Sequence, residues 1–123
     1  MLIEALVALL IFAFGVLGIV GLQASMTKAQ TQSKSRADAS LLAQQLLGSM
    51  WTDSAANQAS YTTANCAGYP RCSEWAARVA AALPGGAVDV AFGAAQVVEV
   101  KITWTPPNEQ QHTYATTSAI AIN

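Results

Sequence analysis

The chain has 123 residues, of which 53% are hydrophobic and only 11% are charged, and its formal net charge is −1. A typical soluble domain contains roughly 25% charged residues, so this composition argues against a disordered chain and against an ordinary cytosolic enzyme. The length allows one domain of ordinary size, and the near-neutral charge gives no positive field for nucleic acid, which we do not expect as a partner.

The N-terminal part of the chain contains an unbroken apolar run of 18 residues, from Ala5 to Leu22. As a helix, such a run covers about 27 Å, close to the roughly 30 Å of a bilayer's hydrocarbon core. A cleavable signal peptide would begin with basic residues and have a shorter apolar stretch. The rest of the chain has too few large apolar side chains to bury the run as a core helix. We therefore predict a segment that lies in a membrane or among similar helices.

Glu4 directly precedes this run, and two interpretations of it remain open. It can lie at the membrane interface and favour the positive end of the helix dipole. Alternatively, it pairs with a cation that another molecule supplies when the helices bundle. Gly15, Gly18 and Gly21 allow close helix approach, and each lowers helix propensity by about 1 kcal/mol relative to alanine. We hypothesise that this segment packs closely and partly unwinds in an assembly.

A single helix of about 50 residues is predicted from the start of the chain, because residues 1–52 contain no proline. Residues 23–36 are polar nearly all round. From residue 37 onward the helical period returns. It places on one face Ala39, Leu42, Ala43, Leu46 and Met50, with Leu47 and Trp51 beside them. The last turns of this helix should therefore pack on the rest of the domain.

After the long helix we predict a loop over residues 53–69, which are rich in Asn, Ser, Thr and Ala. Ser73 is a candidate cap for a short helix over residues 74–83, and Pro84-Gly85-Gly86 should end it. Beyond the glycines, the apolar period becomes two, which is typical of strands. The alternating residues are Val88, Val90 and Phe92; Val98, Val100, Ile102 and Trp104; and Tyr114, Thr116, Ser118, Ile120 and Ile122.

A turn over residues 105–110, which contain Pro106-Pro107-Asn108, separates the last two strands. Three antiparallel strands on the end of a long helix would give an α+β fold.

Cys66 and Cys72 are the only cysteines. A zinc site would need four ligands and usually closer cysteine spacing, so we expect no metal. A disulfide across this short loop would stabilise the domain by about 2 kcal/mol; two reduced thiols in the cytosol are the alternative. Disulfides form outside the cytosol. The basic residues Lys28, Lys34 and Arg36 point the other way, since positive charge after a membrane span favours the cytoplasmic side.

The sequence offers little for catalysis. His112, the single histidine, stands at the start of a predicted strand, where a surface residue is more common than a general base. The seven acidic residues are scattered, and neither a Gly-rich phosphate loop nor a Gly-x-Ser-x-Gly motif occurs. We predict that the chain is not an enzyme and uses no cofactor.

The first twelve residues, MLIEALVALLIF, resemble the mature N-terminus of type IV pilins, in which a processed Phe and one variable residue precede Leu-Ile-Glu. The continuation GVLGIVGLQ, residues 15–23, and the ITWT strand, residues 102–105, resemble the PilV group of minor pilins. One residue precedes Leu2-Ile3-Glu4, where the family has two. Met1 would therefore match the family's second position, and the leader peptide and the N-methylated Phe would be missing from this sequence.

The resemblance implies a type IV pilin-like fold, with the C-terminal half of one long helix packed on a small antiparallel sheet. Residues 1–22 would form the transmembrane and polymerisation half of the helix, residues 23–52 its remainder, and residues 53–123 a globular head. A prepilin peptidase would cleave the precursor. The protein would lie in the inner membrane of a Gram-negative bacterium, with its head in the periplasm, and then enter a cell-surface pilus.

In that family a minor pilin helps to initiate type IV pilus assembly in a priming or tip complex, so the resemblance implies as partners other minor pilins, the major pilin and a tip adhesin. Glu4 would neutralise the N-terminal amine of a neighbouring subunit.

Two alternatives remain: a minor pseudopilin of type II secretion, and a membrane-tethered binding domain or enzyme unrelated to pilins. A DNA-uptake pilin is disfavoured, because no Lys or Arg follows Lys101.

Overall fold

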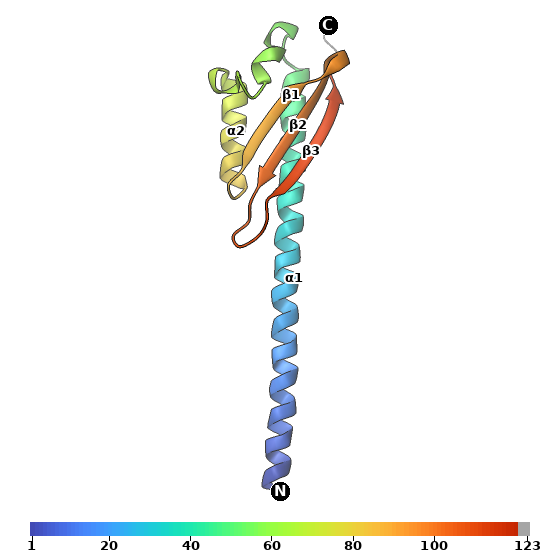
Figure 1. Cartoon of the computed structure of the whole chain (residues 1–123), viewed down its shortest axis with the longest axis vertical. Coiled ribbons are helices and arrows are strands. Elements are labelled where there is room, and N and C mark those ends of the chain that lie inside the picture. Colours follow the sequence, from blue (N-terminus) through green and yellow to red (C-terminus); the bar gives the residue numbers. More distant parts are fainter. Residues whose placement is uncertain (121–123) are drawn as a thin grey trace. The chain divides into compact units, whose positions relative to one another are not determined.

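The computed structural model describes residues 1–120 and divides the chain into two units, Met1–Lys34 and Ser35–Asn123. One helix, α1 (Leu2–Trp51), begins in the first unit and ends in the second (Figure 1). The predicted helix of about 50 residues is thus confirmed, as expected for a segment without proline. The second unit begins at Ser35, inside the predicted middle range 23–52, because the last turns of α1 contribute to its core.

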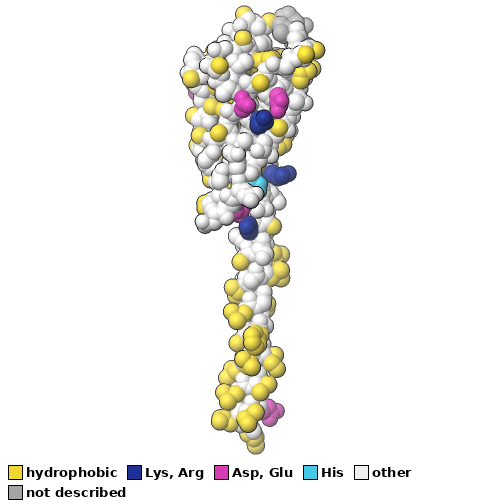
Figure 2. All heavy atoms as spheres, viewed as in Figure 1, with side chains coloured by type: hydrophobic (Ala, Val, Ile, Leu, Met, Phe, Trp, Pro, Cys, Tyr) yellow, Lys and Arg dark blue, Asp and Glu magenta, His cyan; other side chains and the backbone are white. Residues whose placement is uncertain are grey.

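The first unit consists only of α1, and nearly all of its side chains are exposed. Figure 2 shows apolar side chains along the face of this segment that is in view. Farther along, hydroxyl groups bond back to helix carbonyls four residues earlier, as Ser25 Oγ does to Gly21 O at 3.2 Å and Thr27 Oγ1 to Gln23 O at 3.0 Å. The helix is unbroken through Gly15, Gly18 and Gly21.

In the second unit, α1 buries the face that the period predicts. The buried residues are Ala39, Leu42, Ala43, Leu46 and Met50. Leu47 packs at the edge of this core, as predicted, but Trp51 does not, since 53% of its surface is exposed. The indole Nε1 of Trp75 donates a hydrogen bond of 2.7 Å to Leu42 O, which ties the second helix to α1.

This second helix, α2 (Pro70–Ala82), begins four residues before the predicted start. The prediction that Ser73 caps it is wrong: Tyr69 holds the cap position, and Ser73 Oγ donates to Pro70 O inside the first turn. Proline suits the first helical position because its missing N–H is not needed there. The predicted end is confirmed. Gly85 adopts φ +62°, and a Cβ at Gly86 would lie 2.7 Å from Val79 O.

Three antiparallel strands follow in the order β1-β2-β3. They are β1 (Ala87–Phe92), β2 (Val97–Trp104) and β3 (His112–Ala119). The predicted alternation is confirmed: the inner face buries Val90, Val98, Val100, Ile102 and Trp104. The last strand stops at Ala119, one residue before the buried Ile120, and the predicted strand residue Ile122 lies outside the described residues.

The predicted loop over residues 53–69 contains two short 3-10 helices, η1 (Ala55–Tyr61) and η2 (Cys66–Gly68). Two side chains of η1 fix this segment against the rest of the domain. Gln58 Nε2 donates a hydrogen bond of 2.7 Å to Met50 O at the end of α1, and the side chain of Tyr61 is fully buried. A long N-terminal helix followed by a three-stranded antiparallel sheet is the α+β layout of the pilin type.

Candidate functional site

Among residues 1–120, α1 is the one helix that is long and apolar enough to cross a membrane. Its most apolar 18-residue stretch has a mean hydropathy of 2.8, and none of that stretch is buried. A helix that is apolar all round needs lipid or other helices around it, because water solvates it poorly. By length and composition, it could serve as a single-pass anchor.

Glu4 lies in the first turn of this helix. No hydrogen bond or ion pair is found between its side chain and the rest of residues 1–120, and the residue is exposed. A carboxylate in the first turn faces the positive end of the helix dipole. Its charge is therefore available to a group from outside this chain.

Gly15, Gly18 and Gly21 have no atom of another segment within 4 Å of the position of an added Cβ. The bare backbone at these positions is therefore open, which another helix could use for close approach. The hypothesis that the segment partly unwinds concerns an assembly and stays a prediction.

The two cysteines form a disulfide, Cys66–Cys72, with their Cα atoms 5.1 Å apart. The bond links η2 to the first turn of α2, and both residues are buried. It closes a loop that also contains Tyr69 and Arg71.

A polar cluster surrounds Asp53, the second residue after α1. Its side chain is only 8% exposed. It accepts hydrogen bonds from the Ser54 N–H at 2.8 Å, Asn57 Nδ2 at 2.8 Å, Tyr61 Oη at 2.7 Å and Tyr69 Oη. Arg71 Nη1 lies 3.7 Å from Asp53 Oδ2, and the rings of Tyr61 and Tyr69 meet edge to face at 5.1 Å. We call these six residues the Asp53 cluster.

Hydrogen bonds within the cluster shift the pKa values of Asp53 and Tyr61. The hydrogen bond from Tyr69 is the main cause that holds the pKa of Asp53 well below its usual range, followed by the bonds from Asn57 and Tyr61. Burial, and then the bond to Asp53, raise the pKa of Tyr61. Hydrogen bonding to the ionised carboxylate thus favours its charged form. The cluster therefore holds a stable anion, which suits fixing the end of α1 rather than proton transfer near neutral pH.

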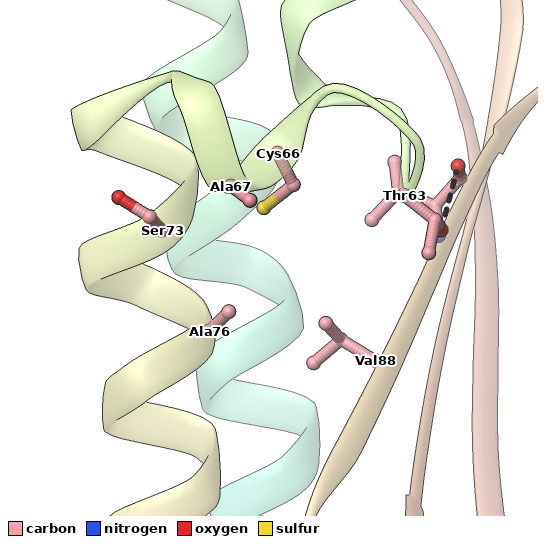
Figure 3. Close-up of a pocket in the computed structure, with 7 residues that line it drawn as sticks. Thr63, Cys66, Ala67, Ser73, Ala76 and Val88 are labelled. Atoms are coloured by element: carbon pink, nitrogen blue, oxygen red, sulfur yellow. Dashed lines mark hydrogen bonds between the residues drawn. The ribbon is translucent and has the colours of Figure 1, made fainter.

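A cavity of about 320 Å³ opens between α2 and β1, next to the disulfide (Figure 3). Its lining consists of Thr63, Cys66, Ala67, Ser73, Ala76, Val88 and Val90. The two hydroxyl groups are engaged within the chain: Thr63 Oγ1 donates to Asp89 Oδ1 at 2.8 Å, and Ser73 Oγ to Pro70 O at 3.2 Å. No charged residue lines the cavity.

His112 is half-buried, although its position at a strand start suggested a surface residue. Its ring stacks on Trp104 with the ring centres 5.7 Å apart, and Nε2 lies 3.3 Å from Glu109 Oε2. Within the described part of the chain, no three His, Cys, Asp or Glu side chains come together in a way that could hold a metal ion.

The Asp53 cluster was not predicted from the sequence. The acids are scattered along the chain, and the partners of Asp53 come from a segment without periodicity. One signal was present: an acidic residue at the C-terminal end of a helix faces the negative end of the dipole. Such a residue needs local donors, and the tyrosines and the arginine beside the cysteines are suitable ones.

No protein-family model, curated protein or solved structure matches this chain.

Proposed function

We propose that this chain is a minor pilin that helps to initiate type IV pilus assembly in a priming or tip complex. The main support is the uncovered apolar helix of Met1–Lys34, which carries a single acidic residue in its first turn. Such a segment is suited to two successive environments, the inner membrane and a bundle of similar helices.

In this proposal, Glu4 acts when the subunit leaves the membrane. An unpaired carboxylate among apolar helices is unfavourable, whereas a well-placed cation compensates for its desolvation. The N-terminal amine of a neighbouring subunit would supply that cation. Because the pair forms only in one register, Glu4 would select the correct axial position of the incoming subunit.

The second unit would be the head, located in the periplasm and then on the pilus. The disulfide supports an oxidising compartment. The head would contact other minor pilins, the major pilin and a tip adhesin, and it would have no catalytic role. The precursor would be a substrate of a prepilin peptidase.

The test replaces Glu4 in the organism that produces the protein. Wild-type chain should be found in sheared pili, whereas Glu4→Ala should remain in the membrane fraction, with pilus incorporation lowered at least about tenfold. Immunoblots of both fractions measure this ratio. Glu99→Ala is the matched control: this exposed acid forms only a loose ion pair of 3.8 Å with Lys101, so incorporation should be unchanged.

Two results would contradict the proposal. If deleting the chain leaves pili intact and blocks protein secretion, the chain is a minor pseudopilin of type II secretion. If Glu4→Ala is incorporated into pili as well as the wild type is, the helix is a simple anchor and the pilin interpretation fails.

A further inference from the structure

The disulfide and the Asp53 cluster meet at the start of α2. Cys72 is the third residue of this helix, and Tyr69, which holds its cap position, lies midway between the two cysteines in the sequence. Arg71 directly precedes Cys72. The loop that the disulfide closes therefore carries two members of the cluster, the tyrosine that donates to Asp53 Oδ2 and the arginine that lies 3.7 Å from the same oxygen.

The first turn of α2 lacks the usual support of a helix N-terminus. The side chain of Tyr69 makes no capping hydrogen bond, and its hydroxyl group bonds to Asp53. The turn is closed by the N–H groups of Cys72 and Ser73, which donate to Tyr69 O at 3.0 and 2.9 Å. A helix end without a capping side chain opens more easily than the helix interior. The disulfide ties this turn to η2, and the cluster ties it to the end of α1.

The cluster in turn fixes the last turn of α1. The Asp53 N–H donates to Met50 O at 3.2 Å, and the Thr52 N–H donates to Gly48 O at 3.2 Å. The carboxylate of Asp53 is itself held by donors from η1 and by Tyr69. A movement of Tyr69 therefore changes what holds the last turn of α1. The disulfide and the end of α1 are connected through the Asp53 cluster.

We propose that the disulfide and the Asp53 cluster form a redox-sensitive latch between α2 and the end of α1. In the oxidised chain, the bond keeps the first turn of α2 closed, and this turn presents Tyr69 and Arg71 to Asp53. In the reduced chain, the first turn of α2 opens, the cluster separates, and the last turn of α1 opens with it. The sheet stays folded in both states. This inference does not depend on the proposed pilin function.

The chemical step is thiol–disulfide exchange with a dithiol. A thiolate of the dithiol attacks one sulfur of the Cys66–Cys72 bond, which breaks as a mixed disulfide forms. The second thiolate of the dithiol then displaces the cysteine from the mixed disulfide. The dithiol leaves as a disulfide, and the chain gains two electrons and two protons as two thiols. Because Cys72 is fully buried and Cys66 is only 7% exposed, attack requires that the first turn of α2 open beforehand.

The rate of reduction therefore measures how readily the latch opens. Coupling between two sites is reciprocal, so a cluster that the disulfide supports must also protect the disulfide. Asp53→Asn and Tyr69→Phe each remove part of the cluster. Each should speed reduction of the full chain by dithiothreitol at least about tenfold, because a hydrogen bond to a charged group contributes that much. The chain is kept in detergent micelles, and mass spectrometry after alkylation counts the free thiols.

Ile102→Val is the matched control for this measurement. Ile102 is fully buried in β2, and the variant loses one methylene group, which lowers the stability of the whole core. It lies toward the end of β2, where the Thr105 N–H donates to Pro84 O beyond the C-terminal end of α2. The latch is at the other end of α2, so the rate of reduction should not change.

Two results of the reduction experiment overturn the proposal. An unchanged rate in either Asp53→Asn or Tyr69→Phe would show that the cluster does not protect the disulfide. A rate that rises as much in Ile102→Val as in Asp53→Asn would show that reduction requires unfolding of the whole core.

Amide hydrogen exchange, read by NMR, tests the other direction of the coupling. In excess dithiothreitol, the amides of Thr52 and Asp53 should exchange at least about tenfold faster than in the oxidised chain. The amide of Thr105, at the opposite end of α2, should be unchanged. Equal exchange at Thr52 in the two states overturns the proposal. Loss of protection at Thr105 also overturns it, because the bond would then hold the whole domain and not a local latch.

Discussion

At Asp53 the chain leaves α1, and a single carboxylate joins three segments. Its hydrogen-bond donors come from Ser54, from η1 and from Tyr69 in the loop that the disulfide closes. A charge placed at the negative end of a helix dipole is unfavourable by itself. The hydrogen bonds reverse this, so the cluster stabilises the fold only while Asp53 is ionised.

This dependence predicts how stability changes with pH. The pKa of Asp53 is lower in the folded state than the roughly 3.9 of an unfolded chain. Its contribution is therefore complete above about pH 4 and is lost as the pH falls toward the folded-state value. Asp53→Asn should lower the melting temperature by several degrees at pH 7. The melting temperature of the variant should also change less than that of the wild type below pH 4, as followed by circular dichroism.

Glu74→Gln is the control for this experiment, because Glu74 is an exposed acid of α2 that lies outside the Asp53 cluster. Equal melting curves for wild type and Asp53→Asn at pH 7 would show that the carboxylate contributes nothing.

The hairpin between β1 and β2 turns through two residues with positive φ, Ala95 at 55° and Gln96 at 58°. Two successive left-handed residues match the twist of a tight hairpin, but Asn-Gly is the usual pair there. A residue with a Cβ is about 1–2 kcal/mol less stable in this conformation. The two strands thus hold Ala95 and Gln96 in a backbone conformation that is unfavourable for both residues.

Replacing the pair by the residues that prefer this conformation should relieve that cost. The double variant Ala95→Asn, Gln96→Gly should raise the free energy of unfolding by about 1–2 kcal/mol, as measured by urea denaturation. Ala94→Gly, next to the turn at negative φ, should not stabilise the protein. A double variant no more stable than the wild type would mean that the turn is relaxed as it stands.

Regular elements were predictable from the sequence because burial repeats with the period of the element. The buried face of α1 and the alternation of β2 follow directly from this rule. The start of α2 was missed because a serine with capping ability competed with a proline that fits the first turn better. The Asp53 cluster was missed because its hydrogen bonds and its ion pair join residues up to 18 positions apart in a segment without a repeat. The disulfide was predicted because Cys66 and Cys72 are the only cysteines, with two reduced thiols as the alternative, and the structure confirms the bond.

At the scale of the molecule, all buried hydrophobic residues of the described chain lie in the second unit, from Ala39 to Ile120. The first unit contributes none of them. The stability of the core should therefore be independent of the membrane-length part of α1.

Removal of residues 1–34 tests this independence. The shortened chain should be a soluble monomer whose melting temperature differs from that of the full chain in detergent by less than about 5 °C, the effect of roughly 1 kcal/mol. Light scattering and circular dichroism measure both properties. An aggregated or unfolded product would show that residues before Ser35 are needed for the core.

The burial of the disulfide also has a consequence for the order of events during biogenesis. Cys72 is fully buried, and its Sγ lies 3.6 Å from the backbone O of Tyr61, a residue whose side chain belongs to the Asp53 cluster. An oxidising enzyme has no access to that sulfur once the core has closed. The bond must therefore form while the chain is still open. A molecule that folds before it is oxidised would keep the Cys72 thiol shielded from the enzyme until it unfolds again.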